Sequence, residues 1–104
     1  MITLDQIPQD VMSEINRLSA IIINTVDPQS IFLFGSYARG DFRSDSDIDL
    51  LVTQPHYQKS RHDAARIYEL SFPQKKELDI IFCSEDSPIG QQIRQKGVLL
   101  YANK

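Results

Sequence analysis

The chain has 104 residues, 41% of them hydrophobic, and its 11 Lys and Arg against 14 Asp and Glu give a net charge of −3. This length is enough for one domain with a core and too small for two, and the composition argues against intrinsic disorder. The acidic balance argues against a dedicated duplex-DNA binder, although a metal could supply positive charge for a nucleotide ligand.

The first half of the sequence predicts one helix followed by two strands. Apolar residues recur at helical spacing from Val11 to Ile22, which predicts a helix over residues 10–25. The apolar run 31–34 predicts a buried strand that leads directly into a turn at Gly35-Ser36. Residues 48–53 predict a second strand.

A further helix and strand are predicted in the third quarter of the chain. Residues 59–72 have helical periodicity, and Tyr68 and Phe72 are expected in the core rather than on a base-stacking surface. Pro73 stops this helix, and residues 78–83 predict the third strand. The basic stretch 74–76 between them is expected to be a solvated turn.

The end of the chain predicts a last helix and a short strand. Ser87 is the expected N-cap, Pro88 opens the helix, Gly97 ends it, and residues 98–101 form the final strand. The order of the elements predicts an α/β (α+β) fold with a mixed β-sheet of about four strands packed by helices. We expect residues 1–104 to form a single domain.

The cellular location is predicted from what the sequence lacks. Cys83 is the single cysteine, so an intramolecular disulfide and a cysteine zinc cluster are excluded, and a small buried side chain is expected. The N-terminus has no signal-peptide pattern, and no apolar run approaches the length of a membrane span. These observations favour a cytoplasmic protein without membrane partners.

Two aspartates stand at the start of the second predicted strand. Side chains alternate along a strand, so Asp47 and Asp49 are expected to point the same way, while Ile48 and Leu50 point to the other face. Two close carboxylates repel each other unless a positive charge lies between them. Carboxylate oxygens without imidazole or thiolate ligands suit Mg²⁺, which shares its coordination shell with phosphates.

Further polar residues are expected near this pair. Asp79 lies inside the apolar run of the third strand, where a charge is costly without a partner, and it would converge on the same metal if the two strands are neighbours. Gly35 would let the backbone approach a phosphate, and Ser36 adds a donor. Arg39 is balanced between a phosphate contact and a structural ion pair, and the role of Tyr37 stays open.

The spacing of these residues resembles a known signature. Gly35-Ser36, ten intervening residues and Asp47-Ile48-Asp49 are similar to the signature of the DNA polymerase beta-like nucleotidyltransferase superfamily. The runs Gly-Ser-Tyr-Ala-Arg-Gly-Asp (residues 35–41) and Ser-Asp-Ile-Asp-Leu-Leu-Val (residues 46–52) resemble its minimal nucleotidyltransferase (MNT) branch in particular. An EF-hand calcium loop does not fit because Leu50 stands where glycine is needed, and a Walker loop does not fit because Asp41 replaces its lysine.

The resemblance implies roles for the matching positions. It implies the nucleotidyltransferase fold, with Asp47 and Asp49 holding two Mg²⁺ ions and Asp79 completing the metal near the acceptor hydroxyl. Gly35 and Ser36 would hold the outgoing phosphates of ATP or another nucleoside triphosphate, with Arg39 as a further nucleotide-binding candidate. The implied activity is transfer of a nucleoside monophosphate, AMP from ATP, to an acceptor hydroxyl.

The resemblance also implies a biological setting. Proteins similar to this chain are often paired with HEPN-domain ribonucleases in toxin–antitoxin systems, where the MNT member is the antitoxin and adenylylates a tyrosine of the toxin. We therefore expect a HEPN-domain toxin partner, in a homo- or hetero-oligomer that completes the site. The alternatives are an antitoxin that neutralises a HEPN ribonuclease by binding alone, and a nucleotidyltransferase that modifies small molecules, as aminoglycoside-modifying enzymes do.

Overall fold

A computed structural model of the chain describes residues 4–54, 61–84 and 86–103, without the side chains of residues 61 and 62. The elements in chain order are a short 3-10 helix η1 (Leu4–Gln6), α1 (Gln9–Val26), β1 (Ser30–Phe34), α2 (Ser36–Arg39), β2 (Ile48–Gln54), α3 (Arg61–Ser71), β3 (Leu78–Ser84), α4 (Pro88–Lys96) and β4 (Val98–Ala102). Among the described residues, no helix has the length and apolar character needed to span a bilayer.

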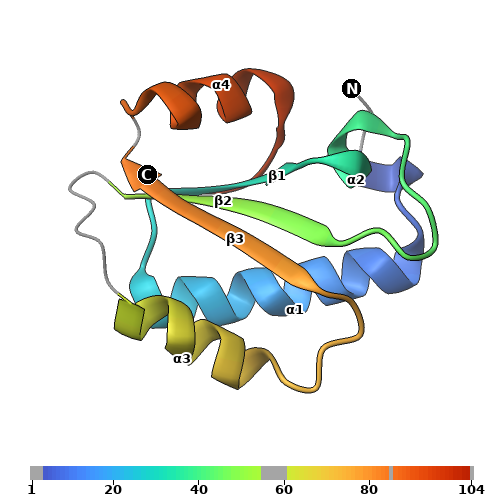
Figure 1. Cartoon of the computed structure of the whole chain (residues 1–104), viewed down its shortest axis with the longest axis horizontal. Coiled ribbons are helices and arrows are strands. Elements are labelled where there is room, and N and C mark those ends of the chain that lie inside the picture. The colour runs from blue at the N-terminus through green and yellow to red at the C-terminus, as the bar shows by residue number, and fades with distance from the viewer. Residues whose placement is uncertain (1–3, 55–60, 85, 104) are drawn as a thin grey trace.

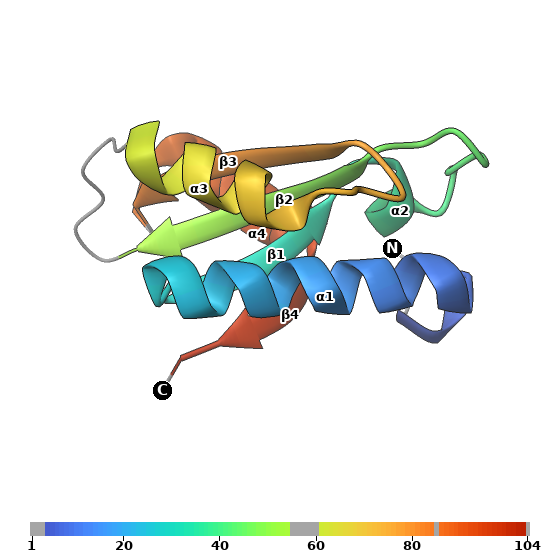
Figure 2. The same cartoon turned by 90° about the horizontal axis from the view of Figure 1, so that it is seen from below.

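The strands form a mixed sheet in the order β3-β2-β1-β4. β1 is antiparallel to both β2 and β4, while β2 and β3 run parallel. Figures 1 and 2 show α1 and α3 together on one face of this sheet, α4 on the other face, and α2 at one end. The α/β fold with a four-stranded mixed sheet is therefore confirmed.

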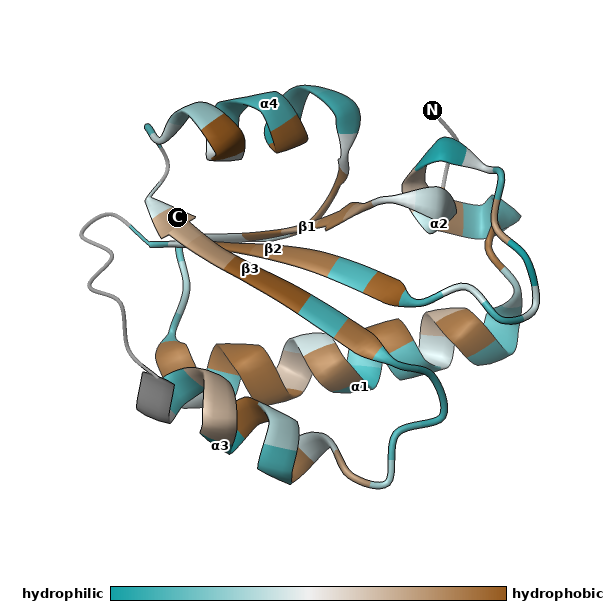
Figure 3. Cartoon of the chain, in the orientation of Figure 1, coloured by the Kyte–Doolittle hydropathy of each residue, from teal (hydrophilic) through white to brown (hydrophobic). Residues whose placement is uncertain are grey.

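The alternation of side chains along the strands divides the core between the two faces of the sheet. Leu33, Leu50 and Val52 pack toward α1 in the main core cluster, together with Ile15 and other apolar residues of that helix. A smaller cluster on the α4 face contains Phe32, Leu51 and Cys83, with Ile81 and Ile93 packed against it. Figure 3 shows α4 turning its hydrophobic residues toward the sheet and its hydrophilic residues away. The prediction that Cys83 is buried is confirmed.

The predicted helices and strands are all present, and the boundaries of α3 differ most. Residues 59 and 60, predicted as its first turn, lie outside the described residues. The helix ends at Ser71, so Phe72 no longer falls on its core-facing side and is 68% exposed. The prediction that Phe72 is a core residue is therefore wrong, whereas Tyr68 does pack against the main core.

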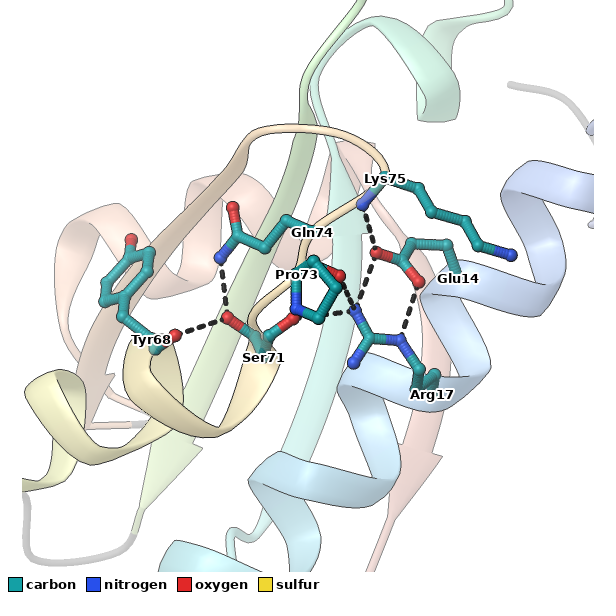
Figure 4. Close-up of polar contacts among 7 residues, drawn as sticks. All are labelled: Glu14, Arg17, Tyr68, Ser71, Pro73, Gln74 and Lys75. Atoms are coloured by element: carbon teal, nitrogen blue, oxygen red, sulfur yellow. Dashed lines mark hydrogen bonds and ion pairs between the residues drawn. The ribbon is translucent and has the colours of Figure 1, made fainter.

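A buried carboxylate joins α1 to the connection between α3 and β3 (Figure 4). Glu14 is only 2% exposed and accepts two hydrogen bonds from the Arg17 guanidinium, at 2.7 and 2.8 Å. It also accepts the backbone N–H of Lys75 at 3.0 Å, while Arg17 donates to the carbonyl oxygen of Ser71 at 2.9 Å. The Arg17 hydrogen bond, opposed by burial, holds the pKa of Glu14 below its ordinary value.

We expect Glu14→Gln to lower the free energy of unfolding by about 1–3 kcal/mol, because it breaks a buried charge pair that also holds a backbone N–H. Since the pKa of Glu14 is lowered on folding, this stabilisation is present above the ordinary pKa of 4.5 and is lost as the pH falls below it. Urea denaturation near pH 7 and near pH 3.5 measures both effects. Glu69→Gln makes the same chemical change at an exposed position of α3, and an equal loss there would contradict the prediction.

Candidate active site

Two carboxylates lie side by side on strands β2 and β3. Asp49 and Asp79 are register partners in the parallel pair, so their side chains leave the same face of the sheet. This is the α4 face, because Leu51 and Ile81, two residues further along each strand, belong to the cluster beneath α4. Figure 3 shows a hydrophilic band crossing the otherwise hydrophobic strands β2 and β3 at the end nearest α2.

The third predicted carboxylate, Asp47, lies just outside strand β2. The strand begins at Ile48, so strand alternation does not set the direction of the Asp47 side chain as the sequence predicted. Burial, followed by the charges of Asp79 and Asp47, raises the pKa of Asp49 to about 6, and the positive charge of Arg39 opposes this rise. Asp49 therefore lies within the electrostatic reach of both other aspartates and of Arg39.

Asp79 differs from the prediction in its burial. The sequence placed this charge inside an apolar run, which suggested a buried carboxylate that needs a partner. In the structure β3 is an edge strand, and the Asp79 side chain is exposed while Asp49 is half-buried. The prediction of a buried charge is wrong because sequence alone could not show which strand lies at the edge of the sheet.

Gly35 lies directly against the Asp49 carboxylate. It follows β1, whose last residue, Phe34, is the register partner of Asp49. The φ of Gly35 is +75°, and a Cβ at this position would lie 2.1 Å from Oδ2 of Asp49. A side chain is therefore excluded both by backbone conformation and by space. Ser36 follows as the half-buried first residue of α2, which places the predicted Gly-Ser turn beside the aspartates.

Arg39 makes an ion pair at the surface. Its Nε donates to Oδ2 of Asp41 at 3.3 Å, and both side chains are more than half exposed. Such a pair contributes little stability because water screens it, so the guanidinium can exchange partners at small cost. Arg39 also lines a pocket of about 280 Å³ together with Gly35 and residues of α4. The predicted ion pair is present, and the position also allows contact with a ligand.

The loop that carries Asp47 is held by a lysine that the sequence did not single out. The Nζ of Lys76 donates to the carbonyl oxygen of Ser44 at 2.7 Å and lies 5.7 Å from the centre of the Tyr37 ring. Tyr37 is 1% exposed and stacks on Phe42, so it is a core residue and has no free face for a nucleotide base. The prediction of a solvated turn is wrong for Lys76, which is half-buried, since a contact across 32 residues leaves no local sequence signal.

The aspartates do not form a preassembled metal cage. Within the described part of the chain, no three His, Cys, Asp or Glu side chains are gathered into a group that could hold a metal ion. Magnesium is usually bound through one or two carboxylates, with water and substrate phosphates supplying the other ligands. The pair Asp49 and Asp79 fits that incomplete kind of site, with Asp47 near enough to add its charge.

Residues 16–104 match the family model described as polymerase beta, nucleotidyltransferase. The chain belongs to this nucleotidyltransferase family. The expected membership of the DNA polymerase beta-like nucleotidyltransferase superfamily is thereby confirmed, and the finer assignment to its MNT branch stays a prediction. No curated protein sequence matches the nucleotidyltransferase at a significant level.

Two solved structures have the same fold as this nucleotidyltransferase. A toxin–antitoxin structure with AMP-PNP superposes with a TM-score of 0.68 over 86% of this chain and 73% of that chain, at 22% identity. A candidate nucleotidyltransferase from Sulfolobus solfataricus superposes with a TM-score of 0.59 over 97% of this chain and 94% of that chain, at 23% identity. At these identities the likeness is one of fold.

We expect Asp49→Asn to stabilise the metal-free protein near pH 7 by about 1–2 kcal/mol, because it removes a half-buried charge that two neighbouring carboxylates repel. The pKa of Asp49 rises on folding from 3.8 to about 6. Protonated Asp49 therefore contributes its full stability to the fold below pH 3.8, and this stability is lost as the pH rises through about 6. The stability difference between variant and parent should therefore grow from pH 4 to pH 7 in thermal unfolding. A constant difference, or an equal effect of Asp45→Asn at an exposed position, would contradict it.

Gly35→Ala should destabilise the fold by about 1–3 kcal/mol and displace the Asp49 carboxylate, because it adds a clash to a strained backbone conformation. Gly40→Ala is the matched control, since Gly40 also has a positive φ, of 93°, at the other end of α2. Urea denaturation gives the stability of both variants, and the ¹³C shift of the Asp49 carboxyl reports the local change. Equal disturbance of Asp49 in both variants would show that the close contact at Gly35 has no specific effect.

Proposed function

We propose that this chain transfers AMP from ATP to an acceptor hydroxyl with the help of Mg²⁺. The observation that carries the proposal is the in-register pair Asp49 and Asp79, with Gly35 in direct contact with the Asp49 carboxylate. Membership of the nucleotidyltransferase family supports the reaction class. Asp47, Asp49 and Asp79 are the proposed catalytic residues, and Gly35, Ser36 and Arg39 are the proposed nucleotide-binding residues.

The carboxylates fit a divalent metal by their chemistry. They are hard oxygen donors, and like charges that lie close together favour a cation between them. We propose that Asp47 and Asp49 hold two Mg²⁺ ions and that Asp79 completes the one nearer the acceptor, with phosphate oxygens as further ligands. Bound Mg²⁺ would neutralise the charge of the phosphates and polarise the reacting phosphoryl group.

The transfer itself needs one bond to form and one to break. The acceptor hydroxyl oxygen forms a bond to the α-phosphorus of ATP, and the bond from that phosphorus to the bridging oxygen breaks and releases pyrophosphate. We propose that Asp79 accepts the hydroxyl proton, and its exposed position at the edge of the sheet, open to an incoming acceptor, supports this role. Gly35, Ser36 and Arg39 lie on the other side of Asp49, where the departing phosphates would be held.

The proposed acceptor is a protein hydroxyl, a tyrosine of a HEPN-domain toxin in the cytoplasm. Support comes from the toxin–antitoxin structure with AMP-PNP, which has the same fold over 86% of this chain. An exposed Asp79 admits a bulky acceptor, whereas a small molecule would need more enclosing walls than this edge of the sheet provides. Neutralisation of the toxin by contact alone is the competing reading, and the transfer experiment separates the two.

The test is incubation of the chain with Mg²⁺, ATP labelled in its α-phosphate and the product of the neighbouring gene, which is the proposed HEPN-domain partner. We expect label on the HEPN protein, its loss with EDTA, and a fall of at least about 100-fold in rate for Asp49→Asn, since that change removes a metal ligand. Asp45→Asn is the matched control, because it makes the same chemical change at an exposed aspartate of the loop before β2. If the chain binds the HEPN protein tightly but transfers label to it from no nucleotide, the proposed enzymatic activity is wrong and the chain is an antitoxin that acts by contact alone.

A further inference from the structure

A pocket lies between the β1–α2 turn and the C-terminal half of α4. It has a volume of about 280 Å³ and is lined by the apolar residues Phe34 and Ile93 and by the polar residues Arg39, Gln92 and Lys96. Gly35 lines the pocket as well, and it is also the residue that lies against the Asp49 carboxylate. Arg39 and Lys96 also line an adjoining pocket with Ala38 and Gln95. Two cations from different helices therefore share one hollow beside the aspartates.

Lys96 has no acidic partner among the residues that the structure describes. Its position is set by the backbone, since the N–H of Gly97 donates to the carbonyl oxygen of Ile93 at 2.6 Å and ends the helix. A Cβ on Gly97 would lie 2.8 Å from the carbonyl oxygen of Leu33, so the end of α4 rests directly on β1. Figure 1 shows this end of α4 on the side of the sheet where α2 lies.

A purely structural explanation for Lys96 is its place at the end of the helix. Basic residues in the last turn interact favourably with the helix dipole, and Arg94 lies in the same turn of α4. Arg94, however, lies 5.7 Å from the centre of the Phe32 ring and lines a different pocket. The dipole therefore accounts for a basic last turn but not for the position of Lys96 in the same pocket as Arg39.

We propose that Lys96, together with Arg39, binds the terminal phosphates of the nucleoside triphosphate. The inference rests on the proposed function, which places the α-phosphate beside Asp49 and Asp79. From there a triphosphate that passes Gly35 enters the pocket and meets both cations. Gln92 is one turn before Lys96 on the same side of α4, and its amide can donate to the same phosphates. The site would therefore recognise the number of phosphates.

The test is the affinity of the purified chain for ATP, ADP and AMP with Mg²⁺, measured by isothermal titration calorimetry. We expect Lys96→Ala to weaken ATP binding about tenfold or more and to change AMP binding less than about twofold, because a charge-assisted contact to the terminal phosphates is lost. Lys96→Arg should retain most of the affinity. Arg94→Ala is the matched control, because Arg94 is also an exposed cation in the last turn of α4, and this variant should bind ATP as the parent does.

The possible outcomes separate this inference from the proposed function. Unchanged ATP affinity in Lys96→Ala, or an equal loss in Arg94→Ala, overturns the role of Lys96 and leaves the proposed transfer reaction intact. An equal loss for ATP and AMP overturns recognition of the terminal phosphates. If the parent chain binds no nucleotide at all, the proposed function fails and this inference fails with it. Thermal unfolding of each variant is the control for folding, and we expect Lys96→Ala to unfold at the same temperature as the parent because Lys96 is exposed.

Discussion

Parallel pairing of β2 with β3 is the constraint on which the candidate site depends. It brings Asp49 and Asp79, thirty residues apart in the chain, to the same level of the same face. A parallel connection must pass over one face of the sheet. Figure 2 shows α3 on the face opposite α4, whereas the aspartates lie on the α4 face. The carboxylate pair is therefore left uncovered by the helix that makes the pairing possible. A shift of one residue in register would turn Asp79 toward the core of α1 and α3.

The opposite face of the sheet stabilises this register through polar contacts as well as apolar packing. The buried Glu14 holds the backbone N–H of Lys75, and the neighbouring Lys76 reaches across to the loop before β2. The backbone N–H of Ile48, at the start of β2, donates to the carbonyl oxygen of Glu77 at 2.9 Å. The loop that precedes β3 is thus fixed both to helix α1 and to the segment carrying Asp47. Packing on one face determines where the carboxylates on the other face meet.

Much of the fold could be predicted from the sequence because the local signals agree with the packing. Apolar spacing in α1, the turn at Gly35 and the Ser87-Pro88 start of α4 each reflect a local preference that the structure retains, with the Ser87 hydroxyl accepting the N–H of Gly90. The Gly-Ser and Asp-x-Asp spacing identified the right family for the same reason. The exposure of Asp79 and Phe72 and the contacts of Lys76 and Lys96 were missed, since they depend on strand order and on where a helix ends. No local pattern encodes either property.

The position of β3 at the edge of the sheet determines how a substrate can approach. A strand in the middle of a sheet has neighbours on both sides, whereas beyond β3 the described residues place no further strand. A long or bulky molecule can therefore lay one group over the carboxylate of Asp79 while the rest of it stays outside the fold. An open edge of this kind cannot exclude molecules by size. Under the proposed function, selectivity for the acceptor would therefore come from a bound partner, and mutations that alter the choice of acceptor are expected in that partner as well as in this sheet.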